Sequence, residues 1–137
     1  MAGISAPQRQ YLAERQLAVL GTGRRGGSPQ LSMVTYLFDG EQFFISVTTD
    51  RAKYWNVLRQ PRISILVPDG RRQVIVYGTA EVLEGAQRDE AIIAIRAHQG
   101  DPLPADYDLS RFSQRLDELG RRVLRVTPEQ VIGEPEG

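Results

Sequence analysis

The chain has 137 residues, of which 41% are hydrophobic and 25% are charged, and these values predict one globular domain over residues 1–137. Seventeen basic residues balance seventeen acidic ones, so the charge indicates neither a nucleic acid nor a membrane surface as partner. The absence of cysteine excludes disulfides, thiolate metal sites and a cysteine nucleophile, and one histidine does not form a metal site alone.

The start of the chain lacks the charged residues and apolar run of a signal peptide, and no segment has the ~18 apolar residues of a membrane span. We therefore expect a cytoplasmic protein. Residues 1–16 are predicted to contain a short N-terminal helix with Pro7 near its first turn. An apolar strand follows at residues 17–20, and the glycine-rich segment 21–27 predicts a turn.

The glycine-rich segment matches the dinucleotide fingerprint through Gly21, Gly23 and Gly26. That motif binds pyrophosphate only when a helix begins inside it and directs its amides at the ligand. A β-rich segment follows here instead, so we interpret the glycines as a flexible hairpin turn. Arg24 and Arg25 at its tip could steer an anionic ligand, although exposed arginines are usually only solvated.

Residues 29–38 are rich in β-branched and aromatic residues, and residues 43–48 alternate in hydrophobicity, so both segments are predicted strands. Asp39 and Gly40 between them are a strong hairpin signal. With the strand at 17–20, these segments predict an antiparallel meander.

Residues 51–59 lack strand alternation and end before Pro61, which predicts a short helix. Strands are expected again at residues 62–67 and 73–83. Gly78 inside the second of these predicts a bulge or a close approach of two backbones.

A helical insertion is predicted at residues 86–119, followed by a strand at 121–127 and a loose tail at 128–137. His98 is interpreted as a residue of a helix C-terminus rather than as a catalyst. Six strands joined by short turns and interrupted by short helices predict a mainly β fold, a small antiparallel barrel.

The junction after residue 48 combines hydroxyl groups, free helix amides and cations, because a strand there passes into a helix. Arg51 offers a planar fork and Lys53 a mobile charge, while Ser46 or Thr48 could add neutral donors. This combination predicts a phosphate-binding site.

The alternative is an ordinary helix start, with Thr49 or Asp50 as its cap and the cations in solvent. Asp50 receives no ligand role, because its carboxylate would repel a phosphate. Trp55 has helical spacing and is interpreted as core, although it could pack under a cofactor.

Four segments stand in an ordered series: Ser28-Pro29-Gln30-Leu31-Ser32-Met33-Val34-Thr35-Tyr36, Arg51-Ala52-Lys53-Tyr54-Trp55-Asn56-Val57, Gln60-Pro61-Arg62-Ile63-Ser64-Ile65-Leu66 and Tyr77-Gly78-Thr79-Ala80. In order and spacing they resemble the pyridoxamine 5'-phosphate oxidase-like flavin and deazaflavin oxidoreductases. The resemblance runs from about Leu17 to Leu83 and, more loosely, through the last strand.

The resemblance implies a six-stranded split β-barrel that forms a homodimer with two cofactor sites at the interface. Arg51 and Lys53 would hold the cofactor phosphate, and one strand would lie along the ring system. Tyr77 would reach the cofactor of the neighbouring subunit. The cofactor-binding residues implied in this way are Gln30, Ser32, Met33, Val34, Ser46, Val47, Thr48, Arg51, Ala52, Lys53 and Tyr77.

The residue sequences of the second and third segments resemble those of the branch that uses the deazaflavin coenzyme F420. Residues 121–137 show no counterpart of the substrate-phosphate residues of the pyridoxamine phosphate oxidases, which argues against vitamin B6 as substrate. The expected activity is hydride transfer to a small unsaturated or oxidised molecule, with solvent, Tyr36 or Tyr77 as proton donor. FMN as cofactor and a non-catalytic cofactor-binding module stay open as alternatives, and no residue is assigned as catalytic.

Overall fold

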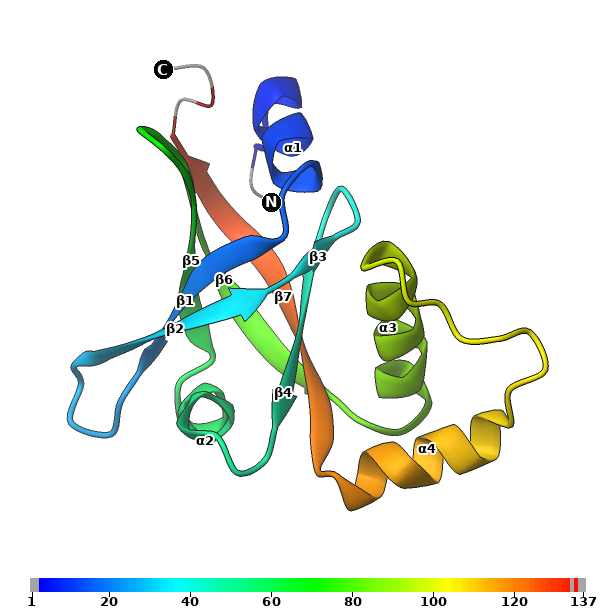
Figure 1. Cartoon of the computed structure of the whole chain (residues 1–137). Helices are drawn as coiled ribbons and strands as arrows, with labels where there is room; N and C mark the ends of the chain where they lie inside the picture. Colours follow the sequence, from blue (N-terminus) through cyan, green and yellow to red (C-terminus); the bar gives the residue numbers. More distant parts are fainter. Residues whose placement is uncertain (1–2, 134, 136–137) are drawn as a thin grey trace.

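The computed structural model describes residues 3–133 and 135. Strands dominate this part of the chain, and short helices interrupt them (Figure 1). In chain order the elements are α1 (Ala6–Ala13), β1 (Leu17–Gly23), β2 (Pro29–Thr35), β3 (Leu37–Phe38), β4 (Phe43–Thr48), α2 (Ala52–Arg59), β5 (Arg62–Asp69), β6 (Arg72–Leu83), α3 (Gly85–His98), α4 (Leu109–Glu118) and β7 (Arg121–Ile132).

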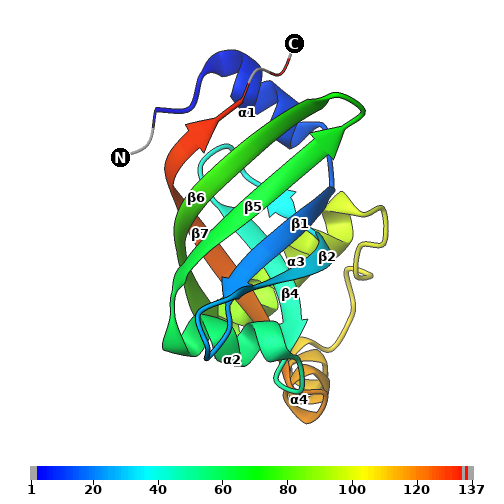
Figure 2. The same ribbon diagram turned by 90° about the vertical axis from the view of Figure 1, so that its left-hand side faces the viewer.

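The strands form one antiparallel sheet in the order β2-β1-β5-β6-β7-β4-β3. The sheet curls so that β2 and β4 approach each other without pairing, which leaves an open seam (Figure 2). A mainly β, curled antiparallel sheet is what the sequence predicts, and it is consistent with a split barrel.

The sheet has seven strands, so the prediction of six is wrong. The predicted strand 29–38 breaks at Tyr36, whose backbone N–H donates to Gln16 and whose hydroxyl donates to Leu12, at 2.8 and 2.7 Å from the two carbonyl oxygens. These contacts belong to the N-terminal segment and not to a strand ladder. The two halves, β2 and β3, consequently lie at opposite edges of the sheet.

The β1–β2 hairpin corrects the predicted limits of the first strand. β1 continues to Gly23, which pairs with Pro29, and the turn occupies residues 24–28. No helix begins in the glycine-rich segment, so the dinucleotide interpretation is excluded, as expected.

The last strand is longer than predicted, because β7 pairs with β6 as far as Ile132. Residues 128–132 are therefore strand and not loose tail, whereas 134 and 136–137 lie outside the described residues, as do 1–2 of the predicted N-terminal segment. The irregularity expected at Gly78 is confirmed. The pairing shifts register there, and a Cβ on Gly78 would overlap the carbonyl oxygen of Thr127.

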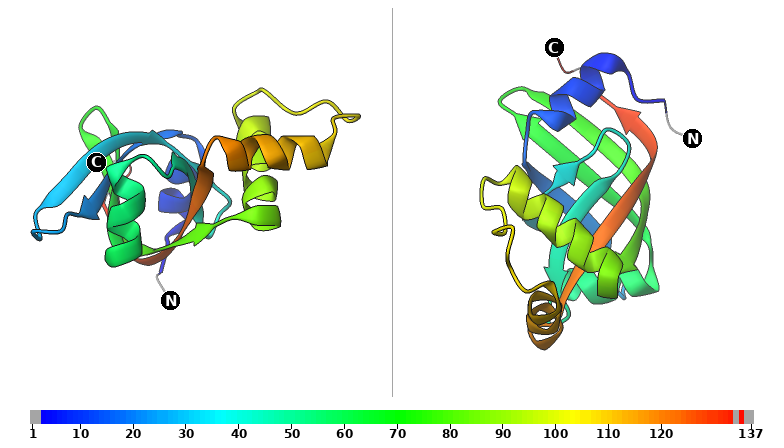
Figure 3. Two further views of the ribbon diagram at one scale, coloured as in Figure 1. Left: turned by 90° about the horizontal axis from the view of Figure 1, so that it is seen from below. Right: turned by 90° about the vertical axis from the view of Figure 1, so that its right-hand side faces the viewer.

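Two apolar clusters hold the molecule together. The larger fills the barrel with inward residues of the strands and is joined by α1 and α2 through Leu12 and Val57. The smaller lies between the outer face of the sheet and the helices α3 and α4, and includes Leu83, Ile92 and Phe112. Figure 3 shows these helices beside β4 and β7, in agreement with the predicted helical insertion.

Helix α2 lies across one end of the barrel, where it contacts β1, β4 and β6 (Figure 1). The start of α2 follows β4, and its end leads into β5. In the part of the chain that the structure describes, no helix is long and apolar enough to cross a membrane.

Candidate functional site

The strand-to-helix junction selected from the sequence lies between the end of β4 at Thr48 and the start of α2 at Ala52. Arg51 is the N-cap residue, and no side chain caps the helix amides by a hydrogen bond. The alternative of an ordinary capped start by Thr49 or Asp50 is therefore wrong. The first amides of α2 lack a side-chain partner and can bind an anion.

Lys53 is the one lysine among the seventeen basic residues of the chain. Its residue is only 8% exposed, and none of the ion pairs and side-chain hydrogen bonds found within residues 3–133 involves it. Burial lowers the pKa of its ammonium group, and the nearby charge of Arg51 lowers it further. The ammonium nitrogen at the end of this largely buried side chain still reaches solvent and has no counter-charge among the described residues, so an anion beside Lys53 would stabilise it.

A carboxylate already lies next to these cations. The hydroxyl of Thr48 donates a hydrogen bond to Asp50. This hydrogen bond holds the pKa of Asp50 below its ordinary value, and the charges of Arg51 and Arg121 act in the same direction. The junction therefore attracts negative charge, and the carboxylate of Asp50 already offsets part of its positive charge.

Arg121 is a basic residue of the junction that sequence reasoning missed. It pairs with Thr48 across β4 and β7, and its Nη1 donates to the Oγ of Ser46 at 3.1 Å. Two residues separated by more than seventy positions meet here because the first residue of the last strand pairs with the last residue of β4. Only a prediction of this strand pairing would have placed the arginine here.

Strand β2 offers its predicted ring-binding residues on two faces. Gln30, Ser32 and Val34 alternate on the less exposed side, and Val34 belongs to the barrel core, whereas Met33 is 64% exposed on the other side. Since β2 pairs only with β1, its second edge leaves backbone groups unpaired. The resemblance implies that the backbone of β2 contacts the cofactor ring. This contact stays a prediction, and the position of β2 at the sheet edge permits it.

A polar network fixes the start of β2 to α2. The Nδ2 of Asn56 donates to the Oε1 of Gln30 at 2.8 Å and to the Oγ1 of Thr22 at 3.1 Å. The Oδ1 of Asn56 accepts from Arg59 at 2.6 Å. Asn56 is buried, so it orients the amide of Gln30. Asn56 belongs to the second of the four segments that resemble the family, but the sequence indicated no such role for it.

The predicted residues do not all share one surface. Gln30 and Ala52 line a groove of about 720 Å³ along α2, whereas Tyr77 lines a different depression of about 590 Å³ with Leu31 and Ser64. Val47 lies in the barrel core. Of the junction residues, Ala52 lines the groove along α2, whereas Arg51, Lys53 and Tyr77 are not among its lining residues.

The structure also tests the interpretations of Trp55 and His98. Trp55 is 54% exposed rather than part of the core, so that interpretation is wrong; its indole N–H donates to the carbonyl of Thr49 at 2.8 Å. His98 is the last residue of α3, as predicted.

The junction between β4 and α2 thus has hydroxyl groups, helix amides and cations with which it can bind an anion.

Comparison with known proteins shows the same fold. A solved structure described as an F420 reductase is 25% identical, covers 90% of this chain and 94% of its own, and has a TM-score of 0.68. A conserved hypothetical protein from Mycobacterium tuberculosis is 20% identical, with coverages of 98% and 86% and a TM-score of 0.78. HutZ, described as a heme storage protein from Vibrio cholerae, is 20% identical, with coverages of 97% and 95% and a TM-score of 0.66.

The sequence profile of the family described as pyridoxamine 5'-phosphate oxidase matches residues 4–133. This range contains the whole sheet, the junction and the groove. The chain therefore belongs to the pyridoxamine 5'-phosphate oxidase family.

Proposed function

We propose that the protein binds the deazaflavin coenzyme F420 and acts as a reductase of a small unsaturated or oxidised organic molecule. The observation that carries the proposal is the largely buried side chain of Lys53, whose ammonium group lacks a counter-charge among the described residues, at a helix start without a side-chain cap. Both features suit the phosphate of such a cofactor, because a charge-assisted contact would replace the missing counter-ion.

The choice of coenzyme F420 rests on the motif spelling and on the likeness to an F420 reductase at 25% identity. FMN is the alternative cofactor, because a phosphate clamp serves either. When bound, a deazaflavin supplies the hydride chemistry, and the protein supplies position and charge.

Different groups of the protein would bind the phosphate and the ring of the cofactor. Lys53 and Arg51 would hold the phosphate, and Arg121 would orient the hydroxyl of Ser46 beside it. The free edge of β2 would lie along the ring. A protein described as a heme storage protein has the same fold, so binding without turnover is the second candidate function.

We also propose a homodimer. Register places Met33, Val19, Leu66, Ile75 and Ile132 side by side on the outer face of five strands. Each of them is partly or fully exposed in the single chain. A row of this kind is typical of a protein interface.

The test is a titration of the apo-protein with coenzyme F420 and with FMN, repeated with Lys53→Met. Methionine keeps the length of the side chain and removes its charge. Loss of the charge-assisted contact should lower the affinity by about 1.5–3 kcal/mol, roughly 10- to 150-fold. Because Lys53 is largely buried and forms no ion pair or side-chain hydrogen bond within residues 3–133, the variant should unfold at the same urea concentration as the wild type or at a higher one.

A second readout follows from the uniqueness of Lys53. Reductive methylation with ¹³C-formaldehyde labels this one side-chain amine and the α-amino group, and NMR then follows its pKa. We expect a pKa below the ordinary lysine value in the free protein and a rise when the cofactor binds. The matched control is Arg71→Ala, which removes an exposed charge from the β5–β6 turn.

The outcomes separate the candidates. Tight binding of FMN alone would select the FMN alternative. Binding of coenzyme F420 without hydride transfer to a panel of enones, quinones and tetrapyrroles would select the binding module. Unchanged affinity in Lys53→Met would contradict the assignment of the phosphate site.

A further inference from the structure

Arg88 on α3 is completely buried, although it carries a charge. Its Nε donates to the carboxylate of Asp89, and its Nη1 donates to the carboxylate of Asp117, each at 2.8 Å. A charge inside a protein is tolerated when it is paired and hydrogen-bonded in this way. A guanidinium has five N–H donors, so these two carboxylates leave donors of Arg88 for other contacts.

The other contacts of Arg88 join three elements, which lie side by side in Figure 3. Its Nη2 donates to the backbone carbonyl and to the hydroxyl of Ser113 on α4, at 3.4 and 3.3 Å. Its Nη1 donates to the backbone carbonyl of Arg121, the first residue of β7, at 3.1 Å. Because the guanidinium is planar and rigid, it holds α3, α4 and the start of β7 in one fixed arrangement.

The turn between α4 and β7, residues 119–120, lies directly against the junction of β4 and α2. The carbonyl of Gly120 accepts a hydrogen bond from the backbone N–H of Thr49 at 3.0 Å. Gly120 has a φ of +66°, which favours glycine, and a Cβ there would overlap the hydroxyl of Thr49. The turn and the junction are therefore in such close contact that a shift of one displaces the other.

Arg121, which follows this turn, connects it to the proposed phosphate site. Its side chain donates to Ser46 at 3.1 Å, and its backbone pairs with Thr48. Its carbonyl accepts from both Arg88 and Arg122, at 3.1 and 2.9 Å. These two donors fix the backbone of Arg121 and therefore the point from which its guanidinium extends toward Ser46.

We propose that Arg88 is a positioning residue for the phosphate site. It holds the α4–β7 turn, and through that turn it places the guanidinium of Arg121 and the backbone of Thr49 where an anion is received. Because Arg88 is completely buried, it does not touch the ligand itself. The inference rests on the proposed function for the identity of the ligand, and it gives the helices α3 and α4 a part in ligand binding.

The first test is a double-mutant cycle between Arg88 and Arg121. Affinity for coenzyme F420 or FMN, whichever the wild type binds, is measured for the wild type, Arg88→Met, Arg121→Met and the double variant. Methionine follows much of the path of an arginine side chain but has no charge and no donor. Each single variant should lose roughly three- to tenfold in affinity, and the double variant should lose clearly less than the product of the two losses, because Arg88 acts through Arg121.

A control variant separates positioning from stability. Arg88→Met should unfold at a lower urea concentration than the wild type, since it leaves Asp89 and Asp117 without their partner. Ile95→Ala removes a buried apolar side chain from the same helix and should also lower the urea midpoint. Ile95→Ala should nevertheless bind the cofactor with wild-type affinity under conditions where both variants are folded. An equal loss of affinity in Ile95→Ala would overturn the positioning role.

Trp55 reports on the junction without any cofactor. It is the chain's single tryptophan, and its indole N–H donates to the carbonyl of Thr49, whose own N–H donates to Gly120. In a ¹H–¹⁵N spectrum of the apo-protein, the one indole resonance should move in Arg88→Met and keep its position in Ile95→Ala.

The outcomes keep this inference apart from the proposed function. An unmoved indole resonance in Arg88→Met, or losses of affinity that multiply in the double variant, would overturn the positioning role and leave the proposed function intact. A wild type that binds neither cofactor would contradict the proposed function, whereas a displaced indole resonance in Arg88→Met alone would still support the positioning role.

Discussion

Asp50 places a negative charge at the point where the proposed cofactor brings another. Asp50 accepts a hydrogen bond from the hydroxyl of Thr48 and lies near the charges of Arg51 and Arg121. The hydrogen bond from Thr48, supported by the charges of Arg51 and Arg121, holds the pKa of Asp50 below its ordinary value, so this carboxylate offsets part of the positive charge of the junction. At the scale of single residues, the site therefore combines a cation that lacks a counter-charge, Lys53, with cations that are partly neutralised.

Asp50→Asn should raise the affinity for the cofactor phosphate by roughly two- to fivefold, because an exposed like charge is removed. The same titration of apo-protein measures it. Glu41→Gln, an exposed carboxylate in the β3–β4 turn, is the control and should bind as the wild type does. A weaker affinity in Asp50→Asn would show that Asp50 orders the site rather than competes with the ligand.

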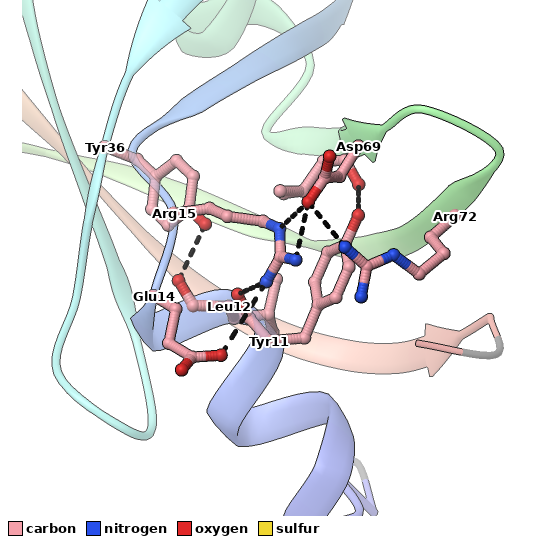
Figure 4. A network of polar contacts seen from close by, with 8 residues as sticks. Tyr11, Leu12, Glu14, Arg15, Tyr36, Asp69 and Arg72 are labelled. Carbon is pink, nitrogen blue, oxygen red and sulfur yellow. Dashed lines mark hydrogen bonds and ion pairs between the residues drawn. The ribbon is translucent and has the colours of Figure 1, made fainter. Parts of the chain in front are cut away.

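At the scale of elements, helix α1 is fixed to the barrel by polar contacts that surround Tyr11 (Figure 4). The hydroxyl of Tyr11 donates to the carbonyl of Val67 at 2.8 Å, and the guanidinium of Arg15 lies 3.5 Å from the centre of its ring. Arg15 also donates to the carboxylate of Asp69, which Arg72 contacts from the other side. Asp69 at the end of β5 thus joins Arg15, two residues after α1, to Arg72 at the start of β6.

The hydrogen bond from Arg15 holds the pKa of Asp69 below its ordinary value, with the charges of Arg72 and Arg15 in support. A depressed pKa in the folded state means that this carboxylate stabilises the fold above its unfolded pKa, near 3.9, and loses that effect as the pH falls. Asp69→Asn should accordingly unfold at a lower urea concentration at pH 7, and the difference from the wild type should shrink as the pH falls below about 4.

Glu118→Gln is the matched control, because its ion pair with Arg115 on α4 has a distance of 3.5 Å and both side chains are more than half exposed. It should shift the urea midpoint much less. A difference between Asp69→Asn and the wild type that persists unchanged at pH 3 would show that the effect is not electrostatic.

At the scale of the whole molecule, the curled sheet has one face on the core and one face partly open. The helices α3 and α4 cover the outer side near β4 and β7, whereas the outer side of β2, β1, β5 and β6 has no helix over it (Figures 2 and 3). Leu31, Met33 and Tyr77 are exposed on that side. This face is where we place the second protomer.

Tyr77→Glu should raise the dissociation constant of the dimer by roughly 30-fold or more, because a charge left unpaired in an interface costs at least ~2 kcal/mol. Sedimentation equilibrium measures it. Leu109→Glu changes an equally apolar, exposed residue on α4 and should leave the dimer intact. A wild-type protein that sediments as a monomer at all concentrations would contradict the proposed interface.

The sequence by itself determined the features that depend on neighbours along the chain. Hydrophobic alternation and the Asp39-Gly40 signal predicted the strand segments and the turn between β3 and β4, although not the break within residues 29–38, and the lack of a helix after Gly26 excluded the dinucleotide motif. The junction residues Arg51 and Lys53 were found because cations, hydroxyls and helix amides follow one another within a few positions. Such signals act within about one turn of structure.

The tertiary structure alone decided what depends on pairing between distant segments. Register brought Arg121 to Ser46 and Asn56 to Gln30, and contacts with the N-terminal segment broke the strand at Tyr36. The burial of Lys53 and the exposure of Trp55 depend on how α2 lies against the barrel. Local propensity carries no information on these contacts, because their energies arise only when the sheet has assembled.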